Sequence, residues 1–533
     1  MVESLVVPEI RIDNQAVTVP DGATILDAAL SLGVRIPTLC YLRGLEPCTS
    51  CFVCVVRVAG REALVPACAT AAVDGMAVHS EVPEVHAARR AAMELLLSEH
   101  AGDCMAPCQC ACPAGMDIPR LTRHIAAGQL PQALRVVKAR IALPSVFGRI
   151  CPAPCEKACR RGKIDRPVAI CMLKRIAGDA DLAGEPWQPK AAPTGRRITI
   201  VGGGPAGLSA AWFALKMGYA CTLIEAAGRL GGGLTNVEPS RLGPDVLERE
   251  LGVLRAMGLQ VQVGRSVVTA DDLAALRHDA DAVLLACGKL TAEQAEGLGL
   301  AWAGHGFKID ADHRTSLAGV FAAGAAAGVG ARMAVRSGAD ALAAVEAIDA
   351  WINGVSAVHG RPWTCHMGAA SPDELTRMLA AGASDSPQRC DEPGAQATGR
   401  DCLAPELEAR RCLHCDCGKA GEHYDPSTWH CKLRAWAHEY GAVAHRHGGQ
   451  RREFQRDASH ELVIYESGKC ISCGLCVQTA RSRGEELGLT FVGRGFQVRV
   501  AVPFGGTFAQ GLRKCAAEAA AACPVGAIVL KSR

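Results

Sequence analysis

Residues 196–232 read RRITIVGGGPAGLSAAWFALKMGYACTLIEAAGRLGG and predict a dinucleotide-binding fold by themselves. An apolar strand over residues 198–201 runs into a G-x-G-x-x-G turn formed by Gly202, Gly204 and Gly207. We expect a helix next and then a second strand that ends at Glu225, an acid at the distance suited to a ribose. Such glycines let the backbone approach a pyrophosphate, whose charge the helix N-terminus stabilises. The segment therefore predicts a Rossmann-type α/β sheet.

Two further features favour FAD over NAD as the dinucleotide. GRLGG follows the acid and resembles FAD-binding members of this fold, which implies cofactor contacts from Arg229, Gly231 and Gly232. The flavin partner sequence recurs at residues 318–328 as AGVFAAGAAAG, with Gly324 as the corresponding glycine. The family usually has an Asp next, where this chain has Ala325, so FAD would lose a charge-assisted contact of roughly 1.5–3 kcal/mol.

The segment before this fold is rich in cysteine. GDCMAPCQCACPAGM (102–116) and GRICPAPCEKACRRGKIDRPVAICMLKR (148–175) flank a stretch, 118–143, that reads as two amphipathic helices. The arrangement resembles the helical N-terminal domain of the glutamate synthase small subunit and of dihydropyrimidine dehydrogenase, which holds two [4Fe–4S] clusters. The resemblance implies one cluster on Cys104, Cys108 and Cys159, and another on Cys112, Cys151, Cys155 and Cys171.

The first of these clusters needs a fourth ligand, for which two candidates stay open. Cys110 is one candidate. His100 is the other, because SEHAGDC has an H-x3-C spacing that resembles the histidine-ligated cluster motif of the cluster-rich subunit of respiratory complex I. An ordinary helix-surface histidine is the alternative interpretation of His100.

The resemblance to the glutamate synthase small subunit ends at one position. That subunit carries a second G-x-G-x-x-G domain, for NADPH, inserted into its flavin domain. Here LLACGKL ends at Leu290 and GVFAAG begins at Gly319, and one βαβ unit alone needs about 30 residues. We therefore expect an FAD-type Rossmann domain that lacks the NAD(P)H-binding insertion.

The N-terminal cysteines are spaced C-x10-C-x2-C-x13-C, as Cys40, Cys51, Cys54 and Cys68. Residues 4–19 read as a hairpin and 23–33 as a helix. The arrangement is typical of a [2Fe–2S] site and resembles the [2Fe–2S] domain of the complex I subunit and of iron-only hydrogenases. Cys48 would also fit a C-x2-C-x2-C motif, but no Cys-Pro follows it. A zinc site is the alternative.

Two further groups lie near the C-terminus. CLHCDCGKAGEHYDPSTWHC offers Cys412, Cys415, Cys417 and Cys431, for which we favour a [4Fe–4S] cluster with structural zinc as the alternative. The last group has Cys470, Cys473 and Cys476 in KCISCGLC and then Cys523 in AACPVGAI. With GLTFVGRGF between them, this group resembles the [4Fe–4S] domain of the complex I subunit. The remaining cysteines fit no cluster motif and read as ordinary thiols: Cys221, Cys287, Cys365, Cys390, Cys402 and Cys515.

Composition limits the class of protein. The net charge is +3 with mixed signs, which gives no argument for nucleic acid or an anionic membrane. No signal peptide or membrane span is recognisable. Twenty-seven cysteines at short spacings indicate metal ligation in a reducing compartment rather than disulfides. We expect a soluble cytoplasmic protein.

Together these patterns predict a multidomain α/β and α+β protein. The expected parts are a [2Fe–2S] ferredoxin-like domain (1–95), a helical two-cluster domain (96–190), an FAD-type Rossmann domain (191–354), a linker (355–405), a cysteine-rich segment (406–459) and a C-terminal [4Fe–4S] ferredoxin-like domain (460–533). The expected cofactors are one [2Fe–2S] cluster, three to four [4Fe–4S] clusters and FAD.

The predicted function is that of an electron-transfer subunit of a multisubunit oxidoreductase linked to NAD(P)H, hydrogen or formate. The flavin would join one- and two-electron carriers and could bifurcate electrons. Expected partners are NADH-dehydrogenase-, hydrogenase- or formate-dehydrogenase-like subunits, with ferredoxin as a further candidate. Two alternatives stay open: a self-contained flavoenzyme, and a wiring scaffold whose Rossmann domain has lost its flavin.

Overall fold

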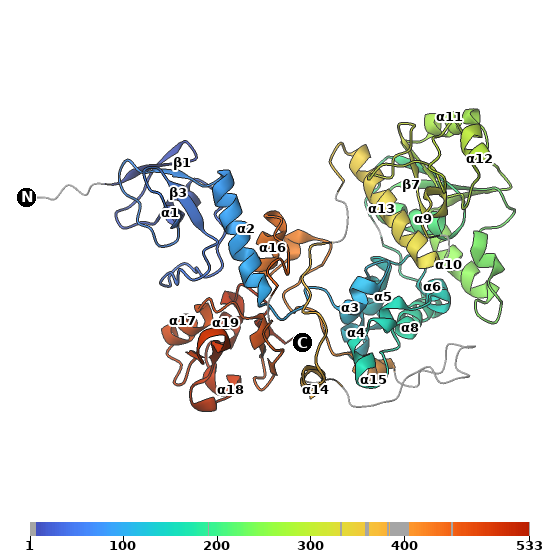
Figure 1. The fold of residues 1–533 in the computed structure, drawn as a ribbon. Helices are drawn as coiled ribbons and strands as arrows, with labels where there is room; N and C mark the ends of the chain where they lie inside the picture. The colour runs from blue at the N-terminus through green and yellow to red at the C-terminus, as the bar shows by residue number, and fades with distance from the viewer. Residues whose placement is uncertain are drawn as a thin grey trace, which may run out of the picture. The chain divides into compact units, whose positions relative to one another are not determined.

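The computed structural model describes residues 7–189, 191–330, 333–357, 362–380, 383, 405–448 and 451–531. The chain forms two compact units (Figure 1). Unit 1 takes Met1–Ala106, Pro362–Gly382 and Cys415–Arg533, and unit 2 takes Pro107–Arg361 and Ala383–His414. Neighbouring cysteines of one sequence motif can therefore belong to different units.

Unit 1 begins with a small sheet of order β2-β1-β5-β3-β4. Its strands are β1 (Glu9–Ile12), β2 (Gln15–Thr18), β3 (Val55–Val58), β4 (Val65–Pro66) and β5 (Ala77–His79). The β1–β2 hairpin and helix α1 (Ile25–Ser31) confirm the elements that the sequence predicts here, and α1 starts with a Thr24–Asp27 capping box. Helix α2 (Pro83–Ser98) packs on β3 and on α16 (Lys432–Glu439).

The C-terminal part of unit 1 has two small sheets, β11-β12-β15 and β13-β14. The elements are β11 (Arg456–Asp457), β12 (Val463–Glu466), β13 (Thr490–Val492), β14 (Arg499–Ala501), β15 (Ile528–Leu530), α17 (Leu475–Ser482), α18 (Phe508–Gly511) and α19 (Ala516–Ala522).

Part of the predicted 355–405 linker is ordered structure rather than a loop. Helix α14 (Pro372–Ala380) buries Glu374, which accepts hydrogen bonds from Arg451 at 2.6 and 2.7 Å. This ion pair fixes the segment within unit 1. Most of the remaining linker, with Cys390 and Cys402, lies outside the described residues.

Unit 2 starts with a helical domain. Its helices are α3 (Pro107–Ala111), α4 (Ile118–Ala126), α5 (Leu130–Lys138), α6 (Pro144–Ile150), α7 (Pro154–Lys157), α8 (Ile170–Ala183) and, from later in the chain, α15 (Pro405–Ala409). Helices α4 and α5 confirm the two predicted amphipathic helices and pack on each other. The short 3-10 turns of the chain are η1 (Arg160–Lys163), η2 (Gly232–Asn236), η3 (Gly324–Ala327), η4 (Pro426–Thr428), η5 (Ser467–Lys469), η6 (Gly495–Gln497) and η7 (Pro503–Gly505).

The rest of unit 2 is a parallel sheet of order β10-β9-β6-β7-β8, which confirms the predicted Rossmann-like fold. Its elements are β6 (Arg197–Val201), α9 (Pro205–Lys216), β7 (Ala220–Glu225), α10 (Pro244–Ala256), β8 (Gln260–Val263), α11 (Ala270–Asp279), β9 (Ala282–Leu285), α12 (Ala292–Gly297), β10 (Val320–Ala322) and α13 (Ala334–Ile352). Between β9 and β10, a fully described segment, α12 is the one helix.

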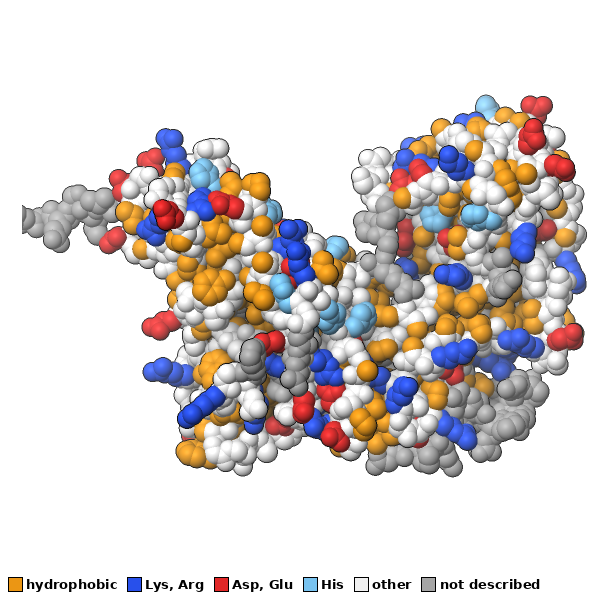
Figure 2. All heavy atoms as spheres, in the orientation of Figure 1, with side chains coloured by type: hydrophobic (Ala, Val, Ile, Leu, Met, Phe, Trp, Pro, Cys, Tyr) orange, Lys and Arg blue, Asp and Glu red, His pale blue; other side chains and the backbone are white. Residues whose placement is uncertain are grey.

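The mixed charge of the surface and the length and polarity of the helices agree with what the amino-acid composition predicts. On the face drawn in Figure 2, acidic and basic side chains are interspersed over both units. Within the described ranges, every helix is too short or too polar to cross a membrane.

Candidate functional site

The N-terminal cysteines form two sulfur pairs in unit 1. Cys40 Sγ lies 3.3 Å from Cys51 Sγ, and Cys54 Sγ lies 3.4 Å from Cys68 Sγ. All four thiols are buried, and the hydrogen bond from Cys51 lowers the pKa of Cys40 to about 5. A tetrahedral metal with metal–sulfur bonds of about 2.3 Å holds two sulfurs about 3.8 Å apart. The site therefore suits two metal ions with two thiolates each.

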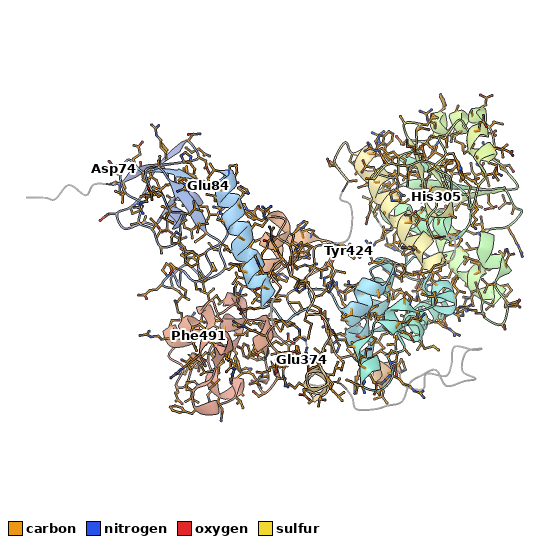
Figure 3. All side chains as sticks on the ribbon, viewed as in Figure 1. Asp74, Glu84, His305, Glu374, Tyr424 and Phe491 are labelled. Carbon is orange, nitrogen blue, oxygen red and sulfur yellow. The ribbon has the colours of Figure 1, made fainter. Side chains whose placement is uncertain are left out.

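Cys48 stands beside this site rather than in it. Its Sγ accepts a hydrogen bond from Gln478 Nε2 at 2.9 Å, and burial, followed by the charge of Cys40, raises its pKa. A side chain at Gly474 would come within 3.1 Å of this sulfur and within 3.8 Å of the Phe491 ring (Figure 3). Cys48 thus joins the N-terminal domain to α17 of the same unit.

The C-terminal cysteines line one small pocket. Cys470, Cys473, Cys476 and Cys523 share it with apolar side chains that include Val500, Val525 and Ile528. Tyr465 also lines the pocket, and its hydroxyl group donates a hydrogen bond to Val500 O at 2.9 Å. Burial raises the pKa of the Cys470 and Cys473 thiols. An apolar pocket lined by four thiols suits a metal group that is held by sulfur ligands.

Four more thiols of unit 1 meet at a place that no single sequence motif marks. We call Cys104, Cys365, Cys417 and Cys431 the unit 1 quartet; all four are buried. Cys104 Sγ lies 3.3 Å from Cys365 Sγ, and Cys104 N donates to Cys365 O at 3.1 Å. The Cys365 hydrogen bond lowers the pKa of Cys104 to about 7. Burial, then the charges of Cys417 and Cys104, raises the pKa of Cys431.

The sequence resemblance groups Cys104 with Cys108 and Cys159, and this grouping stays a prediction. Within unit 1, Cys104 lies against Cys365, which the sequence predicts to be an ordinary thiol. The segment Pro362–Gly382 returns to unit 1 and places Cys365 there, which short-range spacing does not indicate.

His100 is buried beside the same part of unit 1, not exposed on a helix surface. Its Nδ1 has no hydrogen-bond partner. Burial, followed by the charge of Lys469, lowers its pKa to about 4, so the ring is neutral. A neutral imidazole with an unpartnered nitrogen remains a candidate ligand on chemical grounds.

In unit 2, four thiols surround a buried lysine. Lys174 Nζ donates to Phe147 O at 3.3 Å and lies 4.0 Å from Cys171 Sγ. Burial lowers the pKa of Lys174, but Cys171, Cys151, Cys112 and Cys155 together raise it above its usual value. The structure thus brings together the four thiols that the resemblance assigns to one cluster.

The other thiols of unit 2 include Cys159 and Cys412. Burial raises the pKa of Cys159, and the charge of Cys412 adds to the rise. Burial raises the pKa of Cys412, but the charge of His414 and further hydrogen bonds lower it to about 7. Cys108 is buried on α3, where Cys110 is half-buried. Of the four thiols in the predicted site at Cys412, Cys415, Cys417 and Cys431, Cys412 belongs to unit 2 and the other three to unit 1, and the single site stays a prediction.

A buried ion-pair network holds Cys412 in unit 2. Arg411 is fully buried and donates to Glu408 at 2.8 Å, to Asp165 at 3.0 Å and to Arg166 O at 2.7 Å. These bonds fix the residue before Cys412 on the helical domain.

The three fingerprint glycines have different surroundings. A Cβ at Gly207 would clash with Gly202 O, and a Cβ at Gly202 would clash with Ala286 O. A Cβ at Gly204, the N-cap of α9, would meet nothing within 4 Å. Open space at the helix N-terminus is where a pyrophosphate would approach. Glu225 accepts hydrogen bonds from Gly203 N at 2.6 Å and Ala227 N at 2.8 Å.

The remaining nucleotide-site residues lie around this turn. Gly231 N donates to Gly203 O at 2.8 Å, and a Cβ at Gly232 would lie 3.0 Å from Gly204 Cα, so the GRLGG loop covers the glycine turn. Arg229 is exposed on this loop. Gly324 has φ +65° and donates to Asp340 Oδ2 at 2.6 Å. Asp340 of α13 thus supplies a carboxylate next to Ala325.

Within the described residues, no three or more His, Cys, Asp or Glu side chains are spaced to bind one metal ion together.

Four segments of the chain match known families. Residues 9–83 match a 2Fe-2S iron-sulfur cluster binding domain, and residues 80–185 match dihydropyrimidine dehydrogenase domain II with its 4Fe-4S cluster. Residues 169–349 match the pyridine nucleotide-disulphide oxidoreductase family, and residues 463–530 match a 4Fe-4S single cluster domain. The matches confirm both cluster types and the FAD-type Rossmann-like domain.

The chain is also similar to subunits of oxidoreductases. It is 36% identical over 207 residues to the NADP(+)-dependent formate dehydrogenase subunit beta of Moorella thermoacetica (34% of this chain, 29% of that one). It is 35% identical over 209 residues to the NADPH-Fe(3+) oxidoreductase subunit beta of Geobacter sulfurreducens (38% and 30%). It is 35% identical over 191 residues to the glutamate synthase [NADPH] small chain of Mycobacterium tuberculosis (35% and 39%), which confirms that resemblance.

These similarities are partial. The chain spans less than a third of the length of the first two relatives. Among solved structures, an NAD+-reducing [NiFe]-hydrogenase aligns with 98% of this chain and 88% of its own, at 13% identity and a TM-score of 0.36.

Proposed function

We propose that this chain is an iron–sulfur flavoprotein subunit that carries electrons inside a larger cytoplasmic oxidoreductase. The observation that carries the proposal is that thiol sites follow one another within unit 1. Cys51 and Cys470 line one pocket, and Lys432 N, next to Cys431, donates to Pro524 O, next to Cys523, at 2.8 Å. Neighbouring sites of this kind suit stepwise electron transfer.

The proposed ligand sets follow from the thiols that the structure brings together. A [2Fe–2S] cluster would take Cys40, Cys51, Cys54 and Cys68, and [4Fe–4S] clusters would take Cys470, Cys473, Cys476 and Cys523, and Cys112, Cys151, Cys155 and Cys171. A third [4Fe–4S] cluster, the second one in unit 2, would take Cys108, Cys159 and Cys412. Cys110 is the candidate for its fourth ligand. Cysteine-ligated clusters of these types are one-electron carriers.

The residues of unit 2 fit a flavin dinucleotide. The open position at Gly204, the N-terminus of α9 and the GRLGG loop would hold the pyrophosphate, and Glu225 would take ribose hydroxyls in place of Gly203 N. A flavin supplies exchange of two electrons with one partner and of single electrons with clusters. Asp340, beside Gly324, offers a carboxylate where Ala325 has none.

The polypeptide around each thiol site has two tasks in this proposal. Apolar walls such as Val500 and Ile528 keep water from the C-terminal site. The buried cation Lys174 favours the more negative, reduced state of a group bound by its four thiols, since net charge and hydrogen bonds tune cluster potentials.

Substrate chemistry is assigned to partner subunits. Residues 286–319 contain only α12 as a helix, and a nucleotide-binding βαβ unit does not fit there. We therefore place NAD(P)H, hydrogen or formate chemistry in partners of the kind that the relatives' names describe, with ferredoxin as a further electron carrier. Clustered thiolates at short spacing persist in a reducing compartment, which favours the cytoplasm.

The test is the cofactor content and activity of the anaerobically purified full chain. We expect one FAD and at least about 14 iron atoms per chain, from one [2Fe–2S] and three [4Fe–4S] clusters. We also expect a negligible rate of NAD(P)H oxidation by the chain alone. Iron without flavin would leave a wiring scaffold. A chain without iron, or rapid NAD(P)H oxidation by the isolated chain, would overturn the proposal.

A further inference from the structure

None of the matched segments contains the whole unit 1 quartet. Cys365, Cys417 and Cys431 fall outside all four matched segments, and Cys104 is the one member inside a match. Yet Cys104 and Cys365, 261 residues apart in sequence, place their sulfurs 3.3 Å from each other. Cys417 N donates to Cys104 O at 3.5 Å, so the backbone also joins the segments.

A buried arginine faces this quartet with part of its guanidinium unpartnered. Arg434 is 1% exposed. Its Nε donates to Trp363 O at 3.1 Å and its Nη1 donates to Ala420 O at 2.9 Å, whereas Nη2 has no hydrogen-bond partner. Burial lowers the pKa of Arg434, and the charges of the four quartet thiols oppose this effect: Cys104, Cys431, Cys417 and Cys365. A buried cation needs a nearby negative charge to offset its lost hydration.

The backbone is also shaped around the quartet. A Cβ at Gly526 would clash with Cys417 Sγ, so only glycine leaves room for this sulfur. Cys431 is the N-cap of α16, an eight-residue helix whose first turn carries Arg434. The helix N-terminus and the arginine would both stabilise negative charge on Cys431 once a metal replaces its proton.

We propose that Cys104, Cys365, Cys417 and Cys431 bind a further iron–sulfur cluster, with Arg434 as its buried counter-charge. Four convergent thiolates select iron–sulfur clusters or zinc. Structural zinc sites usually contain a C-x2–4-C pair, and this quartet contains none. Its site also neighbours the C-terminal cysteine pocket, because Lys432 N, next to Cys431, donates to Pro524 O, next to Cys523, at 2.8 Å. The choice of iron over zinc rests on the proposed electron-transfer function.

The first test compares two single substitutions in the anaerobically purified full chain. Cys365→Ala removes one member of the quartet. Cys515→Ala is the matched control, because Cys515 is equally buried in unit 1 and its backbone N–H bonds Glu485 outside any thiol group. We expect Cys365→Ala to lose about four iron atoms relative to the control if the cluster is [4Fe–4S], or about two if it is [2Fe–2S].

The outcomes separate this inference from the proposed function. Wild-type protein without iron would defeat the proposed function itself. Wild-type protein with iron, of which Cys365→Ala loses none relative to Cys515→Ala, defeats only the quartet. Loss of one zinc ion with all iron retained would show a structural zinc site and also overturn the inference.

A second measurement serves if Cys365→Ala does not fold. Arg434→Gln removes the counter-charge and Arg434→Lys keeps it. We expect redox titration followed by electron paramagnetic resonance to show one cluster with a more negative midpoint potential in Arg434→Gln, because the cation stabilises the reduced, more negative state. In Arg434→Lys this midpoint potential should return most of the way to the wild-type value. Unchanged potentials for all clusters in Arg434→Gln would contradict the assignment.

Discussion

Gly202, Gly204 and Gly207 share one motif but meet different physical constraints. Gly202 has φ +109° and Gly207 touches the carbonyl of Gly202, so both serve the close packing of β6, α9 and β9. Gly204 has an ordinary backbone conformation and open space in front of it. Of these three positions, Gly204 is therefore the one that requires glycine because of a ligand and not because of packing within the protein.

This difference predicts opposite results for two alanine substitutions. Gly204→Ala should fold with a stability within about 0.5 kcal/mol of wild type but bind FAD at least about tenfold more weakly, because its methyl group fills the pyrophosphate position. Gly207→Ala should destabilise unit 2 by roughly 1–3 kcal/mol or more through overpacking. Thermal unfolding and FAD titration of the apoprotein measure the two effects. Equal destabilisation by both substitutions would contradict this separation.

At the scale of elements, α10 and α6 are joined through a buried carboxylate. Glu250 of α10 accepts a hydrogen bond from Ser145 N at 2.8 Å, at the start of α6. Burial raises its pKa to about 7, against the opposing effects of Lys138 and the Ser145 N–H. The contact between the Rossmann-like and helical parts of unit 2 is therefore sensitive to pH.

The sign of this effect can be predicted. The pKa of Glu250 in the folded protein exceeds the unfolded value of about 4.3. Its contribution to the stability of the fold is therefore largest below pH about 4.3 and is lost as the pH rises to about 7. Glu250→Gln keeps the acceptor without the charge. We expect it to stabilise unit 2 by up to roughly 3 kcal/mol at pH 8 and by little at pH 4.5. Urea unfolding at both pH values measures the difference, and a destabilised Glu250→Gln at pH 8 would falsify the explanation.

Elements and cysteine groups were not equally predictable from sequence. The hairpin at β1–β2, the pair α4–α5 and the β6–α9–β7 unit follow from local periodicity and glycine spacing, and all are confirmed. The contact between Cys365 and Cys104 joins two residues that are 261 positions apart in the sequence, and no local pattern predicts a contact over such a separation. The buried charges Arg434 and Arg411 were missed for the same reason.

At the scale of the whole molecule, the two units have different kinds of core. The main core of unit 1 contains eight thiols assigned to proposed clusters: Cys40, Cys51, Cys104, Cys365, Cys431, Cys473, Cys476 and Cys523. The core beside the parallel sheet of unit 2 consists of aliphatic residues and Phe307, and Cys287 is the one thiol packed at its margin. Thiol ligation therefore contributes more to the stability of unit 1 than to that of the parallel sheet of unit 2.

Removal of iron should act unequally on unit 1 and on the parallel sheet of unit 2. We expect chelation of the full chain to abolish amide protection in β12, α17 and α19, and to leave strands β6, β7 and β9 protected. Hydrogen exchange with mass spectrometry, before and after iron removal, measures both sets in one sample. The apoprotein refilled with iron and sulfide is the control. Equal loss of protection in both sets would show that the sheet of unit 2 also depends on the clusters.

The meeting of Cys104 with Cys365 also constrains the order of biosynthesis. Translation is vectorial, so the ribosome releases Cys40 to Cys68 as one continuous segment, whereas Cys104 emerges 261 residues before Cys365 and still earlier than Cys417 and Cys431. The N-terminal thiols can meet early in synthesis, but the quartet can close only after Cys431 has left the ribosome. Cys104 therefore stays without its partners while more than 261 further residues are made, and a reducing environment during that interval would keep its sulfur available as a ligand.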